Sequence, residues 1–116
     1  MEENIAQEML RILPNDRAWT RNWLVAGSRH CLLGARLRAE GAVVTNNDDV
    51  SHLDDDPYTQ LLARIITEQF PEQVVLGGNP TGMSITFNDI EETHFTDIRM
   101  VLEKAEAIWD ESKESA

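Results

Sequence analysis

Eight consecutive residues, 77–84, come within one position of the phosphate-binding pattern G-x-x-x-x-G-K-[ST]. In a working loop of this kind the lysine supplies positive charge to the terminal phosphates, and the glycines lead into a helix whose amino end faces them. Here Met83 stands in place of the lysine, and the residues that follow are β-prone. The sequence therefore predicts a minor β-hairpin formed by residues 73–76 and 83–87, with a turn between them and no nucleotide site.

Five aspartates lie between residues 45 and 56, in a stretch without periodic apolar residues. Carboxylates at this density suggest calcium, but the register of a calcium-binding loop fails at its third ligand, and its sixth position holds no glycine. Mutual repulsion and low hydrophobicity predict a solvated loop instead. Its aspartates are candidates for contact with a partner protein: Asp48, Asp49, Asp54, Asp55 and Asp56.

Histidine and cysteine do not complete a catalytic or metal-binding set. Glu91 and His94 have the spacing of half a helical di-iron site, but a second such pair is absent from the sequence. Cys31 is the only cysteine, too few for an intrachain disulfide or a cysteine-based zinc site, and its apolar neighbours predict a core thiol. We expect no metal and no cofactor.

A small-ligand pocket or a small enzyme site is an alternative hypothesis, with Asn88, Asp89 and His94 as its residues. His94 could exchange a proton with Asp89 or Glu92, or simply lie beside the start of a helix. The helix start is the favoured interpretation, because three histidines without a partnered nucleophile do not define an active site.

Two tryptophans alternate with two arginines in a short segment, a composition found in protein interfaces and in cores. If the segment is helical, Trp19 and Trp23 share one face while Arg17 and Arg21 share another. A core position is favoured for both tryptophans, and an interface is the alternative. Residues 23–26, followed by Gly-Ser, could equally form a strand that enters a tight turn.

A mainly α fold must hold these residues in place. We expect about four helices with a possible minor β-hairpin, in a single domain over residues 1–109. The apolar periodicity, capping residues and breakers predict helices over 2–13, from Ser28 to Gly41, over 57–70 behind Asp56-Pro57, and from Thr93 or Thr96 through Trp109. Gly34, inside the second helix, is expected to permit close packing. The acidic tail, residues 110–116, should fray.

The overall charge limits the classes of partner. The 116 residues contain 21 acidic and 10 basic side chains, a net charge of -11, which disfavours direct binding to nucleic acid or to an anionic membrane surface. Six of the arginines lie between residues 11 and 38, so the surface can carry both signs. The acidic amino terminus lacks the charge of a secretory signal and no apolar run spans a bilayer, so we expect a cytoplasmic protein.

Four short patches together resemble an uncharacterised actinobacterial and bacteriophage domain family: Trp19-Thr20, residues 31–35 (CLLGA), Phe87-Asn88-Asp89 and residues 101–105 (VLEKA). The resemblance covers about residues 5–109 and implies a single helix-rich domain in a phage or actinobacterial setting. Phe87 stands where that family more often has tryptophan, and the Pro/Gly-rich spacing expected after Asp89 is missing. The family has no assigned activity, so no site residue follows from it.

No complete catalytic constellation is present in the sequence, which favours a non-enzymatic protein. The leading hypothesis is a regulatory or inhibitory module that binds a host protein through the tryptophan–arginine segment or the acidic loop. The first alternative is an acidic DNA mimic that occupies the basic cleft of a nucleic-acid-binding protein. The second is the small enzyme or ligand-binding domain described above.

Overall fold

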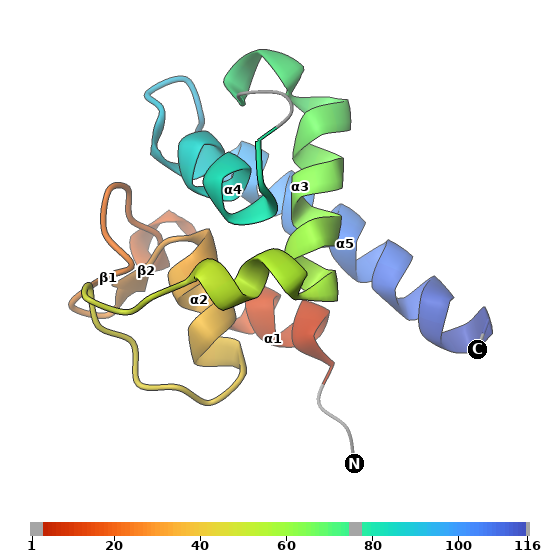
Figure 1. Cartoon of the computed structure of the whole chain (residues 1–116), viewed down its shortest axis with the longest axis horizontal. Helices are drawn as coiled ribbons and strands as arrows, with labels where there is room; N and C mark the ends of the chain where they lie inside the picture. Colours follow the sequence, from red (N-terminus) through yellow and green to blue (C-terminus); the bar gives the residue numbers. More distant parts are fainter. Residues whose placement is uncertain (1–3, 75–77, 116) are drawn as a thin grey trace.

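The computed structural model describes residues 4–74 and 78–115, with side chains as far as Asp110. Within these residues the protein is mainly helical, with a small antiparallel hairpin, as the sequence predicts (Figure 1). Five α-helices are formed, one more than expected: α1 (Ile5–Ile12), α2 (Leu32–Ala39), α3 (Pro57–Gln69), α4 (Pro80–Asp89) and α5 (Phe95–Ser115). Three 3-10 turns join them: η1 (Asp16–Ala18), η2 (Ser51–Asp55) and η3 (Pro71–Gln73).

The hairpin lies between α1 and α2 and not where the sequence predicts it. Strands β1 (Val25–Ala26) and β2 (Arg29–His30) pair around a turn in which Gly27 has a φ of 64°, a conformation that glycine adopts without strain. The strand interpretation of residues 23–26 is therefore confirmed for Val25 and Ala26 only, because Trp23 and Leu24 lie in a bend, and the helical interpretation is wrong.

Helix α4 occupies the place of the predicted second hairpin. The side chain of Asn79 accepts a hydrogen bond from the backbone of Gly82, and Pro80 takes the first helical position, where its missing N–H costs nothing. These start signals outweigh the β propensity of residues 83–87. The predicted strand at 83–87 is wrong, and residues 75 and 76 of its expected partner lie outside the described residues.

Helix α2 begins at Cys31, whose sulfur accepts a hydrogen bond from the backbone of Gly34. Ser28, the predicted cap, lies in the hairpin turn instead. A Cβ atom on Gly34 would overlap the carbonyl oxygen of Leu24, so this glycine lets the segment before β1 lie directly on the helix. The expected packing role of Gly34 is confirmed.

The capping residue of α3 is predicted correctly from the sequence, and the capping residue of α5 is not. The carboxylate of Asp56 accepts a hydrogen bond from the backbone of Thr59 at the start of α3, as the sequence predicts. For α5 the predicted caps are wrong: Thr93 is fully buried and accepts a hydrogen bond from Gln73, while Thr96 lies inside the helix. The backbone N–H of His94 is held by the side chain of Asp97 instead.

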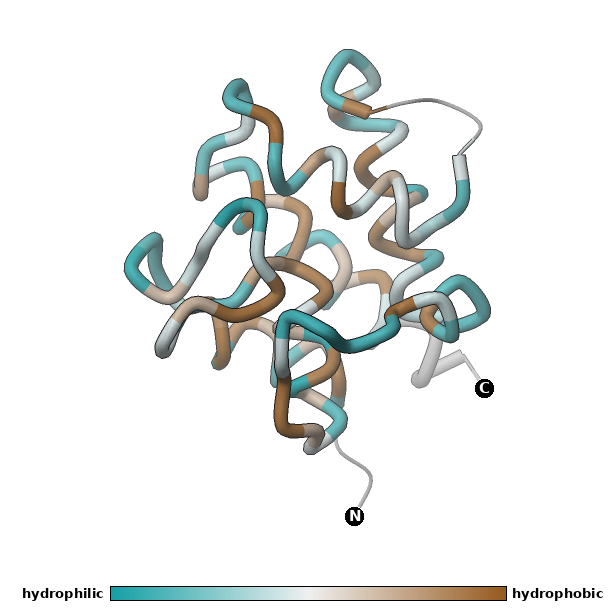
Figure 2. The backbone as a smooth tube through the Cα atoms, turned by 60° about the vertical axis from the view of Figure 1, so that its left-hand side comes forward, coloured by the Kyte–Doolittle hydropathy of each residue, from teal (hydrophilic) through white to brown (hydrophobic). Residues whose placement is uncertain are grey.

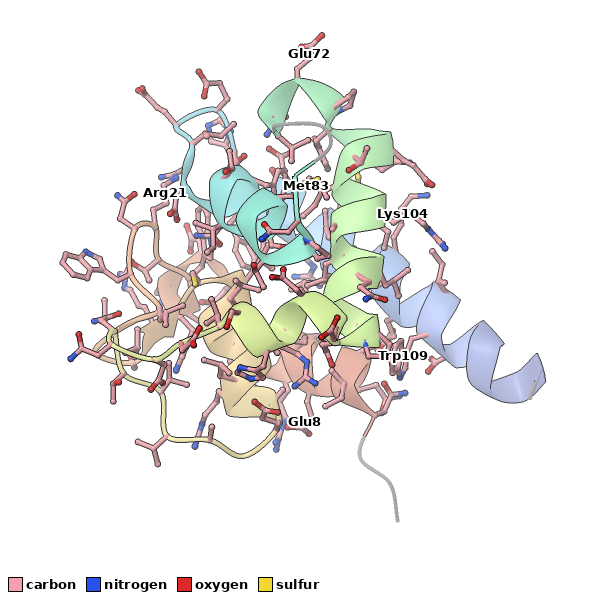
Figure 3. All side chains as sticks on the ribbon, viewed as in Figure 1. Glu8, Arg21, Glu72, Met83, Lys104 and Trp109 are labelled. Atoms are coloured by element: carbon pink, nitrogen blue, oxygen red, sulfur yellow. The ribbon has the colours of Figure 1, made fainter. Side chains whose placement is uncertain are left out.

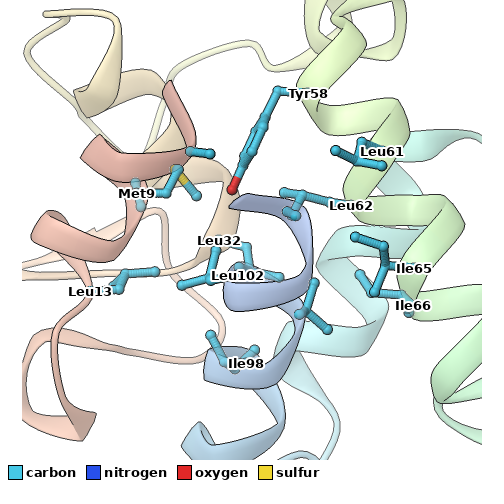
Figure 4. Close-up of a cluster of buried hydrophobic side chains, with 14 of the residues drawn as sticks. Met9, Leu13, Leu32, Tyr58, Leu61, Leu62, Ile65, Ile66, Ile98 and Leu102 are labelled. Atoms are coloured by element: carbon cyan, nitrogen blue, oxygen red, sulfur yellow. The ribbon is translucent and has the colours of Figure 1, made fainter. Parts of the chain in front are cut away.

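The core forms where α3 packs against α4 and α5, and α1 packs against α2 and α5. Figure 4 shows buried core side chains from α1, α2, α3 and α5 lying close together, among them Met9, Leu32, Leu62 and Leu102. Along the tube in Figure 2 the apolar segments lie inside, and the hydrophilic ones form the outer loops. The carboxyl end of α5 extends beyond the other helices (Figure 1), and the fraying expected for residues 110–116 stays a prediction.

Candidate functional site

The two tryptophans of the amino-terminal segment have different environments. Trp19 follows η1 and is 7% exposed within the main core, with its ring 6.1 Å from that of Phe95. Trp23 lies in the bend that leads to β1 and is 58% exposed. The predicted shared helical face is wrong, because the chain is extended or bent between them. The core interpretation holds for Trp19 and fails for Trp23.

Asn88, on α4, connects this segment to the helices. Its side-chain oxygen accepts hydrogen bonds from Trp19 Nε1 at 2.7 Å and from the backbone of Leu32 at 3.1 Å. Its amide nitrogen donates to the carbonyl of Thr20 at 3.0 Å and to the carboxylate of Asp89 at 2.9 Å. With a side chain 1% exposed and every hydrogen-bonding position used, Asn88 is a structural residue.

Asp89 fixes the bend that presents Trp23. Its Oδ1 atom accepts a hydrogen bond from the backbone of Asn22 at 2.8 Å in addition to the one from Asn88. Asn22 has a φ of 70°, a left-handed conformation that asparagine tolerates better than most residues. The carboxylate therefore holds a turn immediately before the exposed indole.

An open pocket of about 330 Å³ lies beside Trp23. One wall is the face of α4 that carries residues 84, 85, 88 and 89. The other walls come from the bend at residues 22–24, the start of α2 and the loop that follows α2. The lining residues are Asn22, Trp23, Leu24, Cys31, Leu33, Asn46, Asn47, Ser84, Ile85, Asn88 and Asp89. Ile85 is also exposed, at 37%, so the pocket has an apolar rim on two sides.

Two polar side chains behind the pocket surface are almost closed to solvent and differ in chemistry. Ser84 is fully buried, and its hydroxyl has no hydrogen-bond partner among the described residues. Burial raises the pKa of the Cys31 thiol above its ordinary value, against the effect of the backbone hydrogen bonds at the start of α2. The thiol is therefore protonated at neutral pH and is a poor nucleophile. Its 5% exposure confirms the expected core thiol.

The three residues of the alternative ligand pocket are not brought together. Asn88 and Asp89 line the pocket beside Trp23, whereas the exposed His94 lines a separate surface groove with Trp19, Phe95 and other residues. The favoured interpretation, in which His94 lies beside a helix start, agrees with its position immediately before α5.

The arginines that flank the tryptophans also separate. The guanidinium carbon of Arg21 lies 4.7 Å from the centre of the Trp19 ring, and Nη2 of Arg21 donates to the carbonyl of Thr93. Arg21, labelled in Figure 3, is thus held against the protein. Arg17 is exposed in η1.

Most of the acidic-loop aspartates have intramolecular roles. Asp48 and Asp49 accept backbone hydrogen bonds from Thr45 and Ser51, which shape the turns of the loop. Asp54 accepts from Thr81, and Asp56 forms two hydrogen bonds with Arg36 at 2.8 and 3.0 Å besides capping α3. Asp55 is exposed. The loop is more ordered than predicted, because η2 forms within it and buries Leu53.

The comparisons with other proteins give no relative: no protein-family model, no curated protein and no solved structure matches the chain. Among the described residues, no group of three or more His, Cys, Asp or Glu is placed to hold a metal ion. No described helix has the length and apolar character needed to cross a membrane.

Sequence reasoning missed the residues of α4 that line the pocket besides Asn88 and Asp89. Ser84 and Ile85 fall in the stretch that was predicted as a strand, where they would lie on opposite faces. The Asn79-Pro80 pair is a helix-start signal that could have corrected this. In a helix from Pro80, residues 84, 85, 88 and 89 share one face.

Proposed function

We propose that this chain is a small non-enzymatic binding module that docks onto a partner protein through Trp23, Ile85 and the pocket between them. The observation that carries the proposal is the exposure of Trp23: an indole that is 58% accessible lies at the rim of a pocket. Large aromatic side chains next to apolar pockets are the usual anchors of protein interfaces.

The position of Trp23 supports an anchor that is prepared before binding. The bend that carries it is held by the bond from Asn22 to Asp89 and by the bond from Asn88 to the carbonyl of Thr20. A backbone that is already held in its binding conformation loses little conformational entropy when a partner covers it, which strengthens binding. The partner, in this proposal, is a host protein in the cytoplasm, and binding regulates or inhibits it.

The DNA-mimic alternative has weaker support. A mimic needs many carboxylates directed toward a basic cleft, but Asp48, Asp49, Asp54 and Asp56 accept hydrogen bonds from their own chain. The six arginines between residues 11 and 38 also interrupt an acidic surface. Mimicry remains an outcome that the experiment below can reveal.

The test is affinity capture from host lysate with three matched baits: the natural chain, Trp23→Ala and Met100→Ala. Met100 is 42% exposed on α5 and does not line the pocket, so it controls for the loss of an exposed apolar side chain. We expect a stoichiometric partner on the natural chain and on Met100→Ala. Trp23→Ala should bind it about 30-fold more weakly, the loss typical of an anchor residue.

Equal capture by the natural chain and Trp23→Ala would overturn the proposal. If capture were instead lost with Asp49→Asn and Asp55→Asn and fell steeply with salt, the DNA-mimic alternative would replace it. If the natural chain captured no protein, the small-ligand hypothesis would replace the proposed function.

A further inference from the structure

We infer that the pocket beside Trp23 receives a lysine side chain of the partner protein; this inference rests on the proposed function and names the chemistry that the partner must present. It follows from the hydrogen-bonding groups that the protein leaves unused in the pocket, from the charge there, and from the apolar wall that leads to them.

Some polar side chains that line the pocket are fully hydrogen-bonded within the protein and others are not. Asn88 is fully engaged within the protein, and Asn46 exchanges two hydrogen bonds with the backbone of Val25. The hydroxyl of Ser84 has no partner among the described residues although the residue is fully buried. Because that hydroxyl is closed to solvent, the charged acceptor that a ligand can reach is the carboxylate of Asp89, which is only partly buried.

The charge of the pocket lining is negative. Asp89 is the one charged residue among those that line the pocket in the described part of the chain, and it forms no ion pair there. The whole chain carries a net charge of -11, so its field adds to the same preference. A cation is therefore favoured in the pocket, and an anionic group is disfavoured.

The hydrogen bonds that Asp89 already accepts favour an ammonium over a guanidinium. Oδ1 of Asp89 already accepts two hydrogen bonds, from Asn22 and Asn88, whereas no hydrogen bond to Oδ2 is found among the described residues. A guanidinium binds a carboxylate best by occupying both oxygens at once, and that arrangement is blocked here. A lysine ammonium needs only separate acceptors and can use Asp89 Oδ2 as one of them.

The apolar part of the pocket lining matches the aliphatic stem of a lysine side chain. Leu24 and Ile85 supply apolar surface along the pocket, which suits the methylene groups of lysine. The indole of Trp23 at the rim is exposed, and an indole ring attracts cations. A volume of about 330 Å³ is near the lower end for ligand pockets, so it suits one side chain better than a large cofactor.

The experiment is an NMR titration of the ¹⁵N-labelled natural chain with two blocked amino acids. N-acetyl-lysine methylamide carries the proposed group, and N-acetyl-norleucine methylamide has nearly the same stem without the ammonium. We expect saturable shifts with the lysine compound at the Trp23 indole N–H and at the amides of Ser84, Ile85 and Asp89. The norleucine compound should bind about tenfold more weakly or worse.

Matched variants identify the carboxylate that matters. Asp89→Asn removes the charge from the pocket, and Asp55→Asn removes an equal charge from an exposed position outside it. We expect Asp89→Asn to weaken binding of the lysine compound about tenfold and Asp55→Asn to leave it nearly unchanged. If Asp89→Asn does not fold, the comparison of the two compounds on the natural chain still decides the inference.

Several outcomes would overturn the inference: equal binding of the two compounds, tighter binding of an arginine compound, shifts spread over the acidic surface, or no saturable shift at all. Its failure is distinct from that of the proposed function. A partner captured through Trp23 but indifferent to Asp89→Asn would sink the inference alone. Lysine binding without any Trp23-dependent partner would sink the proposed function and indicate a site for free amines.

Discussion

The indole nitrogen of Trp19 donates a 2.7 Å hydrogen bond to the side-chain oxygen of Asn88, and this buried contact joins residues 69 positions apart. The same oxygen accepts from the first residue of α2. One amide thus fixes the amino-terminal segment, α2 and α4 relative to one another. The exposed position of Trp23, four residues after Trp19, depends on that arrangement.

Removal of the Asn88 side chain should strongly destabilise the protein. In Asn88→Ala the buried N–H groups of Trp19 and Leu32 lose their acceptor, at a cost of about 1 to 3 kcal/mol for each buried group left unpaired. We expect urea unfolding, followed by tryptophan fluorescence, to show a loss of about 3 kcal/mol. Asn47→Ala, an exposed residue in the same pocket lining, should change stability by less than about 0.5 kcal/mol. Equal losses in the two variants would contradict the role assigned to Asn88.

Gly34→Ala should destabilise the protein although alanine is the better helix former. Helix propensity alone favours the alanine by about 1 kcal/mol, but its Cβ would overlap the carbonyl oxygen of Leu24. Overpacking of this kind costs about 1 to 3 kcal/mol. Thermal unfolding of Gly34→Ala should therefore occur well below that of the natural chain. A higher Tm would show that the segment before β1 does not lie on α2.

Because of the Arg36–Asp56 pair, the free energy of unfolding should decrease as the pH falls into the acid range. Burial by itself would raise the pKa of Asp56, but the hydrogen bonds from Arg36 and Thr59 outweigh it and hold the pKa below its ordinary value. A carboxyl group with a lowered folded-state pKa stabilises the fold above its unfolded pKa, near 4, and loses that contribution as the pH falls through the folded value.

The measurement is the free energy of unfolding of the natural chain and of Asp56→Asn between neutral and strongly acidic pH. Near pH 7 the variant should be less stable by about 2 kcal/mol, because it loses charge-assisted hydrogen bonds to Arg36. The gap should narrow below about pH 4. A gap that stays constant with pH would contradict the ion pair.

The Cys31 thiol should react slowly with a disulfide reagent such as DTNB while the protein is folded. Burial keeps its pKa above the ordinary value, and its exposure is 5%. We expect the single thiol to react much faster in urea, where neither effect persists. A folded-state rate equal to that of the unfolded chain would show that this end of the pocket is open.

The sequence was most informative where a local signal and the tertiary contacts agree. Asp56 and Pro57 predict the start of α3, and Gly34 predicts a close approach, because each signal acts on neighbouring residues or needs only the absence of a side chain. Residues 83–87 show the opposite case, since their β propensity favoured a strand while the cap at Asn79 began a helix.

The candidate site depends on contacts that no local pattern contains. Trp19 and Trp23 have the same residue type and lie four positions apart, yet one is buried and the other exposed. Their difference arises from Asn88 and Asp89, more than 60 positions away. Sequence reasoning marked all four residues as candidates, but it could not assign them to core, support or surface.

The most direct test of the account is to observe Trp23 itself when the partner binds. With 5-fluorotryptophan incorporated, the chain gives one ¹⁹F signal for each of its three tryptophans, and Trp23→Phe identifies the signal of Trp23. On addition of the purified captured partner, we expect the Trp23 signal to shift or broaden strongly while that of Trp109 on α5 changes little. A complex that forms without any change at Trp23 would contradict the account.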